Sequence, residues 1–286
     1  MKYLRLLRVK HYIKNGLVFL PLFFAHKLTV IDLFLHTLLA FAIFSLLSSA
    51  VYIINDIKDA EKDRMHPTKC KRPIASGAVS VPTASVISAA LLLGVAALIY
   101  FYGNGLMFWL VPAGYLVLNV AYSLGLKNVP IVDISILASG FLLRVLYGSV
   151  VTGIPISNWL YLTVIAIAFY LGLGKRRGEI LHYTGENTRP VLKFYNQGFL
   201  DKNMLMCVAL GIVFYSLWTV DKNTIERVGG DQLLWTVPLV IMIFFKYSMA
   251  VETKADGDPV EVILKDKLLM VLAAILGLAL LGIVYF

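Results

Sequence analysis

The feature that most constrains this chain is a series of apolar stretches, most of them about 20 residues long. We identify nine, at 15–27, 31–55, 82–102, 106–124, 131–152, 157–175, 203–221, 232–250 and 268–286. A helix of about 20 apolar residues crosses the hydrocarbon core of a bilayer, and a sequence that is 59% hydrophobic and 15% charged is not that of a soluble globular domain. We therefore predict an all-α, polytopic membrane protein, with nine transmembrane helices around a central cavity and a single integral-membrane domain over 1–286.

The first of these stretches, 15–27, is short for a membrane crossing and contains Pro21. Proline removes a backbone donor and kinks a helix. We expect either a tilted or kinked membrane helix here, or a re-entrant segment that enters and leaves on one side.

The lysines and arginines fall between alternate apolar stretches. With a cytoplasmic N-terminus, the inward-facing segments are 1–14, 56–81, 125–130, 176–202 and 251–267. Together with Lys175 and Lys246 at helix ends, they hold nearly all of the cations, and the outward loops hold only Lys27, Lys222 and Arg227. The positive-inside rule predicts a multi-pass protein of the cell (inner) membrane, with a cytoplasmic N-terminus and cytoplasmic cap loops. The net charge of +9 then reflects topology and anionic partners, and we expect no nucleic-acid binding.

One stretch, 55–77, concentrates charge where an apolar run ends. Asp56, Asp59 and Asp63 stand at i, i+3 and i+7, so on a helix they share one face, and Asn55 lies one turn before Asp59. Stacked like charges repel each other unless a cation lies between them. Carboxylate and amide oxygens suit Mg²⁺, which often bridges to substrate phosphates. We predict that this face binds Mg²⁺.

Basic residues follow these carboxylates closely in the sequence. Lys69, Lys71 and Arg72 are able to bind the phosphates that a metal would orient. The alternative is a solvated loop whose charges only fix the topology. The proximity of the carboxylate face to the basic cluster favours a metal–phosphate site.

Polar residues beside or within two other apolar stretches are further candidates. Tyr122 and Lys127 close one stretch, Asp133 opens the next, and Arg144 lies inside it. An arginine within a membrane is costly and normally faces a cavity or a partner. We predict that Arg144 binds substrate; the alternative is a structural ion pair with a carboxylate such as Asp133.

The segment 172–179, GLGKRRGE, places three cations and one carboxylate at the inner end of an apolar stretch. A functional interpretation gives Lys175 or Arg176 a phosphate, and Glu179 a metal or ribose contact. A stop-transfer cluster explains the same residues equally well.

Two segments have simple structural explanations. Lys14 and Asn15 begin the first apolar stretch, where a lysine often anchors a helix at the membrane surface. The segment 256–266 lacks the ligand pattern of an EF-hand and is better explained as a turn with an N-cap followed by a helix. Its acidic residues are Asp256, Asp258 and Glu261.

A family resemblance rests on the charged stretch. The motif NDxxDxxxD, formed by Asn55, Asp56, Asp59 and Asp63, and the following HPxKxxRPIASG at 66–77 resemble the first signature of the UbiA superfamily of intramembrane prenyltransferases. The motif is long and specific, and the family's all-helical fold agrees with nine apolar stretches over the whole chain. The resemblance implies an enzyme in which these four residues hold Mg²⁺ on a diphosphate.

Four segments, 8–22, 122–148, 174–179 and 257–267, are similar to one branch of that family, the decaprenyl-phosphate phosphoribosyltransferases. That branch transfers phosphoribose from 5-phosphoribosyl 1-diphosphate to a polyprenyl phosphate and releases diphosphate; the product leads to arabinose donors for cell-wall polymers. Aromatic prenyltransferases usually carry a second aspartate-rich motif, where this chain has GKRRGE. The resemblance therefore does not favour a second metal-bound prenyl diphosphate site.

The resemblance also implies roles for individual residues. Asp56 and Asp59 would hold Mg²⁺, and Lys69 and Arg72 would stabilise the leaving diphosphate while the lipid phosphate attacks the anomeric carbon. The predicted substrate-binding residues are Lys14, Asn55, Tyr122, Lys127, Arg144, Lys175, Arg176 and Glu179. Which of the cations binds which phosphate does not follow from the sequence.

The expected partners are a polyprenyl phosphate lipid, 5-phosphoribosyl 1-diphosphate and the bilayer, and a homo-oligomer is left open. The alternative enzyme is a UbiA-type prenyltransferase that moves a prenyl group from a prenyl diphosphate to an aromatic acceptor. An anion transporter or lipid carrier would explain the basic loops, but it gives no reason for the stacked carboxylates.

Overall fold

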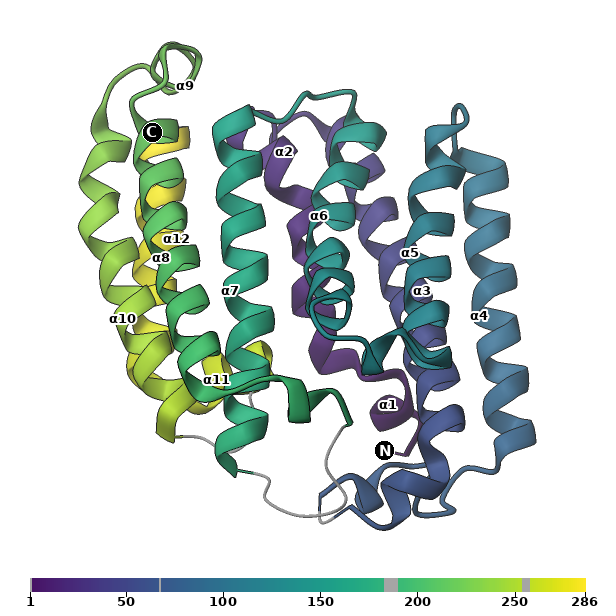
Figure 1. Ribbon diagram of the computed structural model, residues 1–286. Coiled ribbons are helices and arrows are strands. Elements are labelled where there is room, and N and C mark those ends of the chain that lie inside the picture. Colours follow the sequence, from purple (N-terminus) through teal and green to yellow (C-terminus); the bar gives the residue numbers. More distant parts are fainter. Residues whose placement is uncertain (1, 67, 183–189, 254–257) are drawn as a thin grey trace.

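The computed structural model (Figure 1) describes residues 2–66, 68–182, 190–253 and 258–286, with only the backbone at His182 and Thr253. This part of the chain is all-helical and contains no strand, as predicted. The helices are α1 (Lys2–Leu7), η1 (Val9–Phe19), α2 (Leu20–Phe24), α3 (Ile31–Arg64), η2 (Lys69–Lys71), α4 (Val81–Tyr102), α5 (Met107–Leu124), η3 (Leu126–Asn128), α6 (Val132–Thr152), α7 (Asn158–His182), η4 (Pro190–Phe194), α8 (Gln197–Thr219), α9 (Lys222–Val228), η5 (Gln232–Thr236), α10 (Val237–Thr253), α11 (Pro259–Lys265) and α12 (Lys267–Tyr285).

The prediction of nine membrane helices needs one correction. Within the described ranges, eight helices are long and apolar enough to cross a membrane, which makes the chain a multi-pass membrane protein. They correspond to the second to ninth predicted stretches. The first stretch, 15–27, forms no such helix: it belongs to η1, a 3₁₀ helix, and to the short α2.

The combination of η1 and α2 still runs the height of the bundle, from the N-terminus to the opposite end (Figure 1). A 3₁₀ helix rises about 2.0 Å per residue and an α-helix about 1.5 Å, so these 16 residues extend roughly 30 Å. Pro21 lies in the first turn of α2, where its missing N–H costs nothing. Gly148 of α6 allows the close approach of η1, because a Cβ there would collide with the carbonyl of Val18.

The long helix α3 continues for more than two turns beyond its apolar part and ends at Arg64. The segment 56–64, expected as the start of a loop, is therefore helical, and the aspartates share a helix as predicted. The predicted cap loops also contain η2, η3, η4 and α11.

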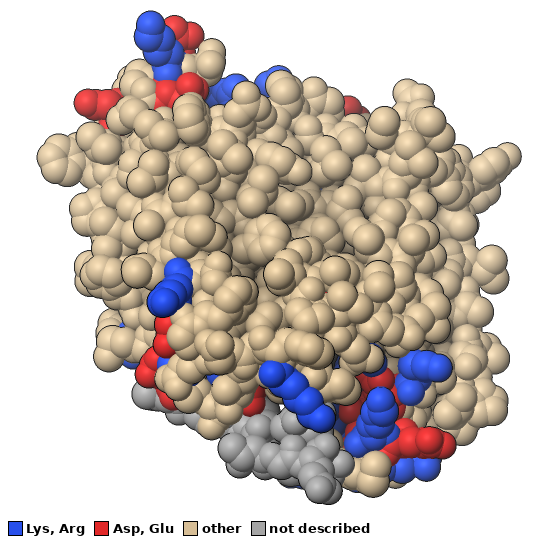
Figure 2. Space-filling model, viewed as in Figure 1, with Lys and Arg blue, Asp and Glu red and all other residues tan. Residues whose placement is uncertain are grey.

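Charged side chains gather at the two ends of the molecule and leave a broad uncharged band between them (Figure 2). The lower edge in this view carries most of them and corresponds to the end of α3, the start of α8 and α11 (Figure 1). We call this the charged end. A smaller group surrounds α9 at the upper edge.

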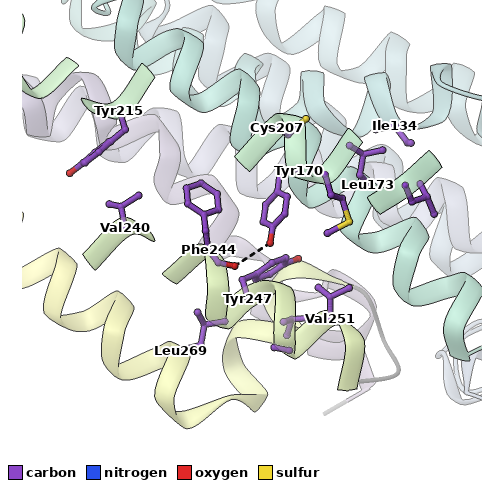
Figure 3. Close-up of a cluster of buried hydrophobic side chains, with 14 of the residues drawn as sticks. Ile134, Tyr170, Leu173, Cys207, Tyr215, Val240, Phe244, Tyr247, Val251 and Leu269 are labelled. Carbon is purple, nitrogen blue, oxygen red and sulfur yellow. Dashed lines mark hydrogen bonds between the residues drawn. The ribbon is translucent and has the colours of Figure 1, made fainter. Parts of the chain in front are cut away.

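Buried apolar side chains form two large clusters on either side of η1. One joins η1 to α3, α4, α5 and α6, and includes Phe44 and Tyr147. The other joins α7, α8, α10 and α12, where Tyr170 donates a hydrogen bond to the carbonyl of Phe244 at 3.3 Å (Figure 3). Because lipid provides no hydrophobic driving force between helices, close packing and such hydrogen bonds hold the helices together. The helix η1 contacts α3, α6 and α11, so it lies along the junction of the two halves.

Candidate active site

The first part of the site is a pair of arginines around one buried aspartate. The Asp56 side chain is only 3% exposed, and its Oδ1 accepts hydrogen bonds from Arg8 Nη2 at 2.5 Å and from Arg72 Nη1 at 3.0 Å. The two arginine side chains remain 20% and 25% exposed. A buried carboxylate is thus held by two cations that are still open to solvent.

The remaining motif carboxylates follow from the helical geometry of α3. Residues advance about 100° each, so Asp63 returns almost to the direction of Asp56, whereas Asp59 is turned by about 60°. Accordingly, Arg72 Nη1 also contacts Asp63 Oδ2 at 2.7 Å, and Asp59 pairs instead with Lys127 beyond the end of α5. The three aspartates therefore share one face of α3, as predicted. Within that face, Asp56 and Asp63 point toward Arg72, whereas Asp59 points toward Lys127.

Asn55 lies on the same end of α3 and is held by a different neighbour. Its Oδ1 accepts a hydrogen bond from the hydroxyl of Ser123 at 3.0 Å. This bond fixes the amide toward α5, next to the side on which Asp59 meets Lys127.

The predicted Mg²⁺ ligands do not form a ready metal site. Among the described residues, no three acidic, histidine or cysteine side chains converge closely enough to hold an ion. Arginine and lysine take the place that we expected a metal to fill between the aspartates. Nevertheless, Asp56 and Asp63 both direct an oxygen at one nitrogen of Arg72, so their oxygens come close enough for a cation to contact both. This all-oxygen set fits Mg²⁺ once the guanidinium moves aside.

The second part of the site lies along η1. A 3₁₀ helix has three residues per turn, so Arg8, His11 and Lys14 form a single row, with Arg8 at the N-cap position. Arg8 contacts Asp56, and Lys14 Nζ contacts both carboxylate oxygens of Asp258 at 3.2 and 3.1 Å. The row therefore links the α3 carboxylates to the start of α11.

Asp258 combines a structural and an electrostatic role. Its Oδ1 accepts the backbone N–H of Val260 at 3.0 Å, which confirms the predicted N-cap and helix. Burial alone would raise its pKa, but Lys14, Lys175 and His11 outweigh burial and hold the pKa below its usual range. Asp258 is thus ionised at neutral pH. Asp256, its neighbour in the motif, lies outside the described residues.

His11 sits in the middle of the row. Its Nδ1 is buried without a hydrogen-bond partner, 4.0 Å from Asp258 Oδ1, and its ring centroid is 5.7 Å from that of Tyr52. Burial, with smaller effects from Lys14, Arg8 and Lys175 that outweigh Asp258, lowers its pKa from 6.5 to about 4. At neutral pH the row therefore presents a neutral imidazole between two cations.

Arg176 lies in a separate and closed network. Its side chain is 0% exposed and donates to Asp133 Oδ2 at 2.6 Å, to Glu179 Oε2 at 2.6 Å and to the hydroxyl of Tyr122 at 3.1 Å. Tyr195 donates to the other oxygen of Asp133 at 2.6 Å. Three predicted substrate-binding residues thus meet here, with Arg176 bound to both Tyr122 and Glu179.

Arg144 is also enclosed, but not by the carboxylate we expected as the alternative. Its Nε donates to Asn15 Oδ1 at 2.7 Å and its Nη2 to the hydroxyl of Tyr115 at 3.1 Å, with the guanidinium 5.6 Å from the ring of Phe44. Asp133 pairs with Arg176 instead. Arg144 therefore joins η1 to α5 and α6, next to the end of the row at Lys14.

Two further basic residues at the charged end, His66 and Lys69, follow α3 in the sequence. Lys69 begins η2, and its backbone N–H donates to Nδ1 of His66. Partial burial, with help from Lys69, lowers the pKa of His66, while Glu179 acts in the opposite direction. The chain after α3 and the end of α7 thus lie within electrostatic range of each other.

A cavity of about 210 Å³ lies apart from these groups, between α7, α8 and α10. Arg177, Asp201 and Glu252 line it, together with apolar residues. Arg177 pairs with both carboxylates, at 2.6 and 3.0 Å. None of the predicted site residues lines this cavity.

Several residues of the site were not predicted. Arg8, His11 and Asp258 belong to it, and the signal for the first two was their spacing of three together with Lys14. An α-helical period of 3.6 separates such residues around the helix, so the row emerges only in a 3₁₀ helix. The pairing of Lys14 with Asp258 spans 244 positions, and no local signal predicts it.

The chain is similar in sequence to several known proteins. The sequence profile of the UbiA prenyltransferase family matches residues 16–174. A Corynebacterium glutamicum protein named decaprenyl-phosphate phosphoribosyltransferase is 34% identical over 279 residues, covering 94% of this chain and 82% of that protein. A protein of the same name from Mycolicibacterium smegmatis is 34% identical over 242 residues, and the match covers 82% of this chain and 75% of that protein.

The fold is similar to that of a solved structure described as a UbiA homolog from Archaeoglobus fulgidus bound to GPP and Mg²⁺. The TM-score is 0.71 at 18% identity, and the match covers 100% of both chains. At this identity, the likeness concerns the fold alone.

Proposed function

Because the chain belongs to the UbiA prenyltransferase family, we propose that it is a membrane enzyme that transfers 5-phosphoribose from 5-phosphoribosyl 1-diphosphate to a polyprenyl phosphate. Diphosphate is the second product. Relatives named decaprenyl-phosphate phosphoribosyltransferase, matched over most of their length, support this choice of donor and acceptor.

The observation that carries the proposal is the balanced set of charges on and around α3. Asp56, Asp59 and Asp63 are paired with three cations, Arg8, Arg72 and Lys127. A metal diphosphate brings both signs of charge: its phosphates suit the cations and its metal suits the carboxylates. Binding would exchange protein–protein ion pairs for protein–ligand pairs without leaving a buried charge alone, which is the main cost of breaking such pairs.

Asp56, Asp59 and Asp63, with Asn55, are the residues that would hold Mg²⁺. The bound ion would neutralise the diphosphate and so make it a better leaving group. The solved family member with Mg²⁺ in its description supports a divalent metal in this fold.

The chain's own residues would act mainly by charge. In the transfer, the C1–O bond to diphosphate breaks and a bond forms between C1 and an oxygen of the lipid phosphate, so the diphosphate takes the electron pair. We assign the stabilisation of that charge to Arg72, Arg8 and Lys69, because it is the largest requirement of an oxocarbenium-like transition state. The acceptor phosphate is already anionic, so no general base is needed.

Arg176 and Arg144 receive a different role in this proposal from the one predicted. Both are enclosed by protein partners, Arg176 by Asp133 and Glu179, and Arg144 by Asn15 and Tyr115. We assign them to holding α6 against α7 and η1, so that the neighbouring site keeps its shape.

The proposal also covers the setting of the reaction. We place the protein in the cell membrane with its charged end in the cytoplasm, where a water-soluble sugar diphosphate is available and where the positive-inside rule puts most cations. The lipid product would lead to arabinose donors for cell-wall polymers, as the resemblance implies.

A transfer assay tests the proposal. Purified protein in detergent is incubated with Mg²⁺, a polyprenyl phosphate and 5-phosphoribosyl 1-diphosphate labelled in the ribose, and the lipid phase is counted. We expect label in the lipid that is lost when EDTA is added. Absence of label, together with consumption of a prenyl diphosphate and an aromatic acceptor, would refute phosphoribosyl transfer in favour of prenyl transfer.

A further inference from the structure

Building on the proposed function, we propose that the η1 row binds the sugar donor along its length: Arg8 at the diphosphate, His11 at a ribose hydroxyl, and Lys14 with Lys175 at the 5-phosphate. In this arrangement, the diphosphate end of the donor lies at Arg8 beside Asp56, and the 5-phosphate end lies at Lys14 beside Asp258. The acceptor phosphate would then approach from outside the row.

The spacing of the row suits one extended small molecule. Each step of three residues in a 3₁₀ helix advances about 6 Å, so Arg8 and Lys14 are separated by about 12 Å along the axis. Their side chains point to different carboxylates, Asp56 and Asp258, which are in contact with opposite ends of the same helix segment. A donor held at Arg8 by its diphosphate would therefore direct its other end toward Lys14.

The chemical pattern of the row matches the pattern of the donor. The row runs cation, neutral imidazole, cation, because burial keeps His11 uncharged at neutral pH. The donor runs diphosphate, ribose hydroxyls, phosphate. A lipid phosphate has a single anionic group and an apolar chain, so it would use only one of the three positions.

Within the row, His11 has a polar atom that no other group in the described part of the protein satisfies. Its Nδ1 is buried and has no partner, which costs free energy in a folded protein. Asp258 Oδ1, at 4.0 Å, is too far for a hydrogen bond. A hydroxyl lying between the two cations would supply the missing partner.

The far end of the row carries the charge that a phosphate requires. Lys14 Nζ contacts both carboxylate oxygens of Asp258, and Lys175 acts on the same carboxylate electrostatically. Two ammonium groups therefore lie near this end of the row, and a terminal phosphate can accept hydrogen bonds from such groups.

A double-mutant cycle tests this assignment, in which the 5-phosphate of the donor and the ammonium group of Lys14 are removed separately and together. Wild-type protein and Lys14→Met are compared with the complete donor and with ribosyl 1-diphosphate, which lacks the 5-phosphate. We expect each single change to reduce kcat/KM about 100-fold. With the truncated donor, both proteins should then be equally poor, and KM for the polyprenyl phosphate should not change.

Variants around Lys14 make the test independent of any one substitution. Lys10→Met lies on the same helix but off the row and is exposed, so it should behave as wild type. Lys175→Met should repeat the pattern of Lys14→Met if the latter does not fold. His11→Phe keeps an aromatic ring against Tyr52 and should lower kcat/KM for the complete donor about tenfold. With a deoxyribose analogue of the donor, His11→Phe and wild-type protein should have the same kcat/KM.

Two results would overturn the assignment. One is a rise in KM for the lipid in Lys14→Met, with an equal loss on both donors, because the lysine would then hold the acceptor. The other is an undiminished wild-type rate with the truncated donor. Both results require a wild-type protein that is active with the complete donor. If the proposed function itself were wrong, wild-type protein would transfer no label from that donor.

Discussion

Two arginine-centred networks at the charged end are built from the same residue types and differ in access. Arg176 is 0% exposed, and its partner Asp133 is also 0% exposed. Arg8 and Arg72 surround an equally buried Asp56, but they are 20% and 25% exposed themselves. The first network is closed to solvent and the second is open on its cationic side.

The difference indicates which charges are structural and which can be exchanged. A buried ion pair offers little net stability, but losing one partner leaves a charge that is costly to bury. In the closed network no ligand can replace a lost partner. In the open network, water or a substrate can reach the cations, so the same ion pairs can be exchanged at a small cost.

The largest effect that we expect is on the closed network. Arg176→Met should leave the buried Asp133 carboxylate without its cation, although still hydrogen-bonded by Tyr195, and should lower the free energy of unfolding by about 3–5 kcal/mol. Thermal unfolding in detergent, followed by tryptophan fluorescence, measures this. Adding Asp133→Asn should recover much of the loss, because it removes the orphaned charge, and the exposed Arg227→Met should have no effect. An unchanged melting temperature in Arg176→Met would show that this network is not structural.

The next effect concerns function rather than stability. Asp56→Asn keeps the shape of the side chain but removes the charge between Arg8 and Arg72, so we expect turnover to fall at least about 100-fold. Its melting temperature should stay close to that of wild type, because the arginines are open to solvent. Asp32→Asn, at the exposed far end of the same helix, is the matched control. A loss of folding with retained specific activity would reverse the comparison between the two networks.

The contrast also shows what the sequence can predict. Apolar length alone predicts both bounds of half of the eight membrane helices: α4, α5, α6 and α12 begin and end within about one residue of the prediction. The charged ends of α3, α7 and α8 extend beyond the apolar stretch and were not predicted as helical. The aspartates could be placed on one helical face because their spacing is local. Both features depend on neighbours in sequence.

Partners that are distant in sequence could not be predicted in this way. Arg176 was expected to bind phosphate and Arg144 substrate, yet both are enclosed by residues from other helices, such as Asp133 and Asn15. Access depends on how helices pack, and residue type contains no information about it. The η1 row is hard to predict for a second reason: a 3₁₀ helix is rarely stable over 11 residues, so an apolar stretch does not indicate a period of three.

A smaller effect tests the geometry of the open network. Arg72 Nη1 contacts both Asp56 and Asp63. A lysine side chain carries a compact ammonium group and cannot reproduce the geometry of the planar guanidinium. Arg72→Lys should therefore lower kcat/KM by about tenfold while stability is retained. Steady-state assays with varied donor measure it. An effect as large as that of Asp56→Asn would mean that Arg72 contributes more than charge and one bridging contact.

The smallest effect concerns pH and His11. Burial lowers the pKa of this histidine to about 4, so between about 6.5 and 4 the unfolded chain binds a proton that the folded protein does not. Stability is thus complete above about pH 6.5 and falls as pH decreases, by at most about 1.4 kcal/mol per pH unit for one proton. Asp258 does not oppose this in that range, because its lowered pKa keeps it ionised.

Melting temperatures between pH 7.5 and 5 measure this slope, and His11→Asn should flatten it. His66 also has a lowered pKa and titrates in the same direction, so His66→Asn is the necessary companion variant. His66 is less deeply buried than His11, and we expect its substitution to change the slope less. A slope that His11→Asn leaves unchanged would mean that water already reaches this imidazole. The far end of the row would then be open, as the cations around Asp56 are, and Nδ1 would not need a substrate hydroxyl as its partner.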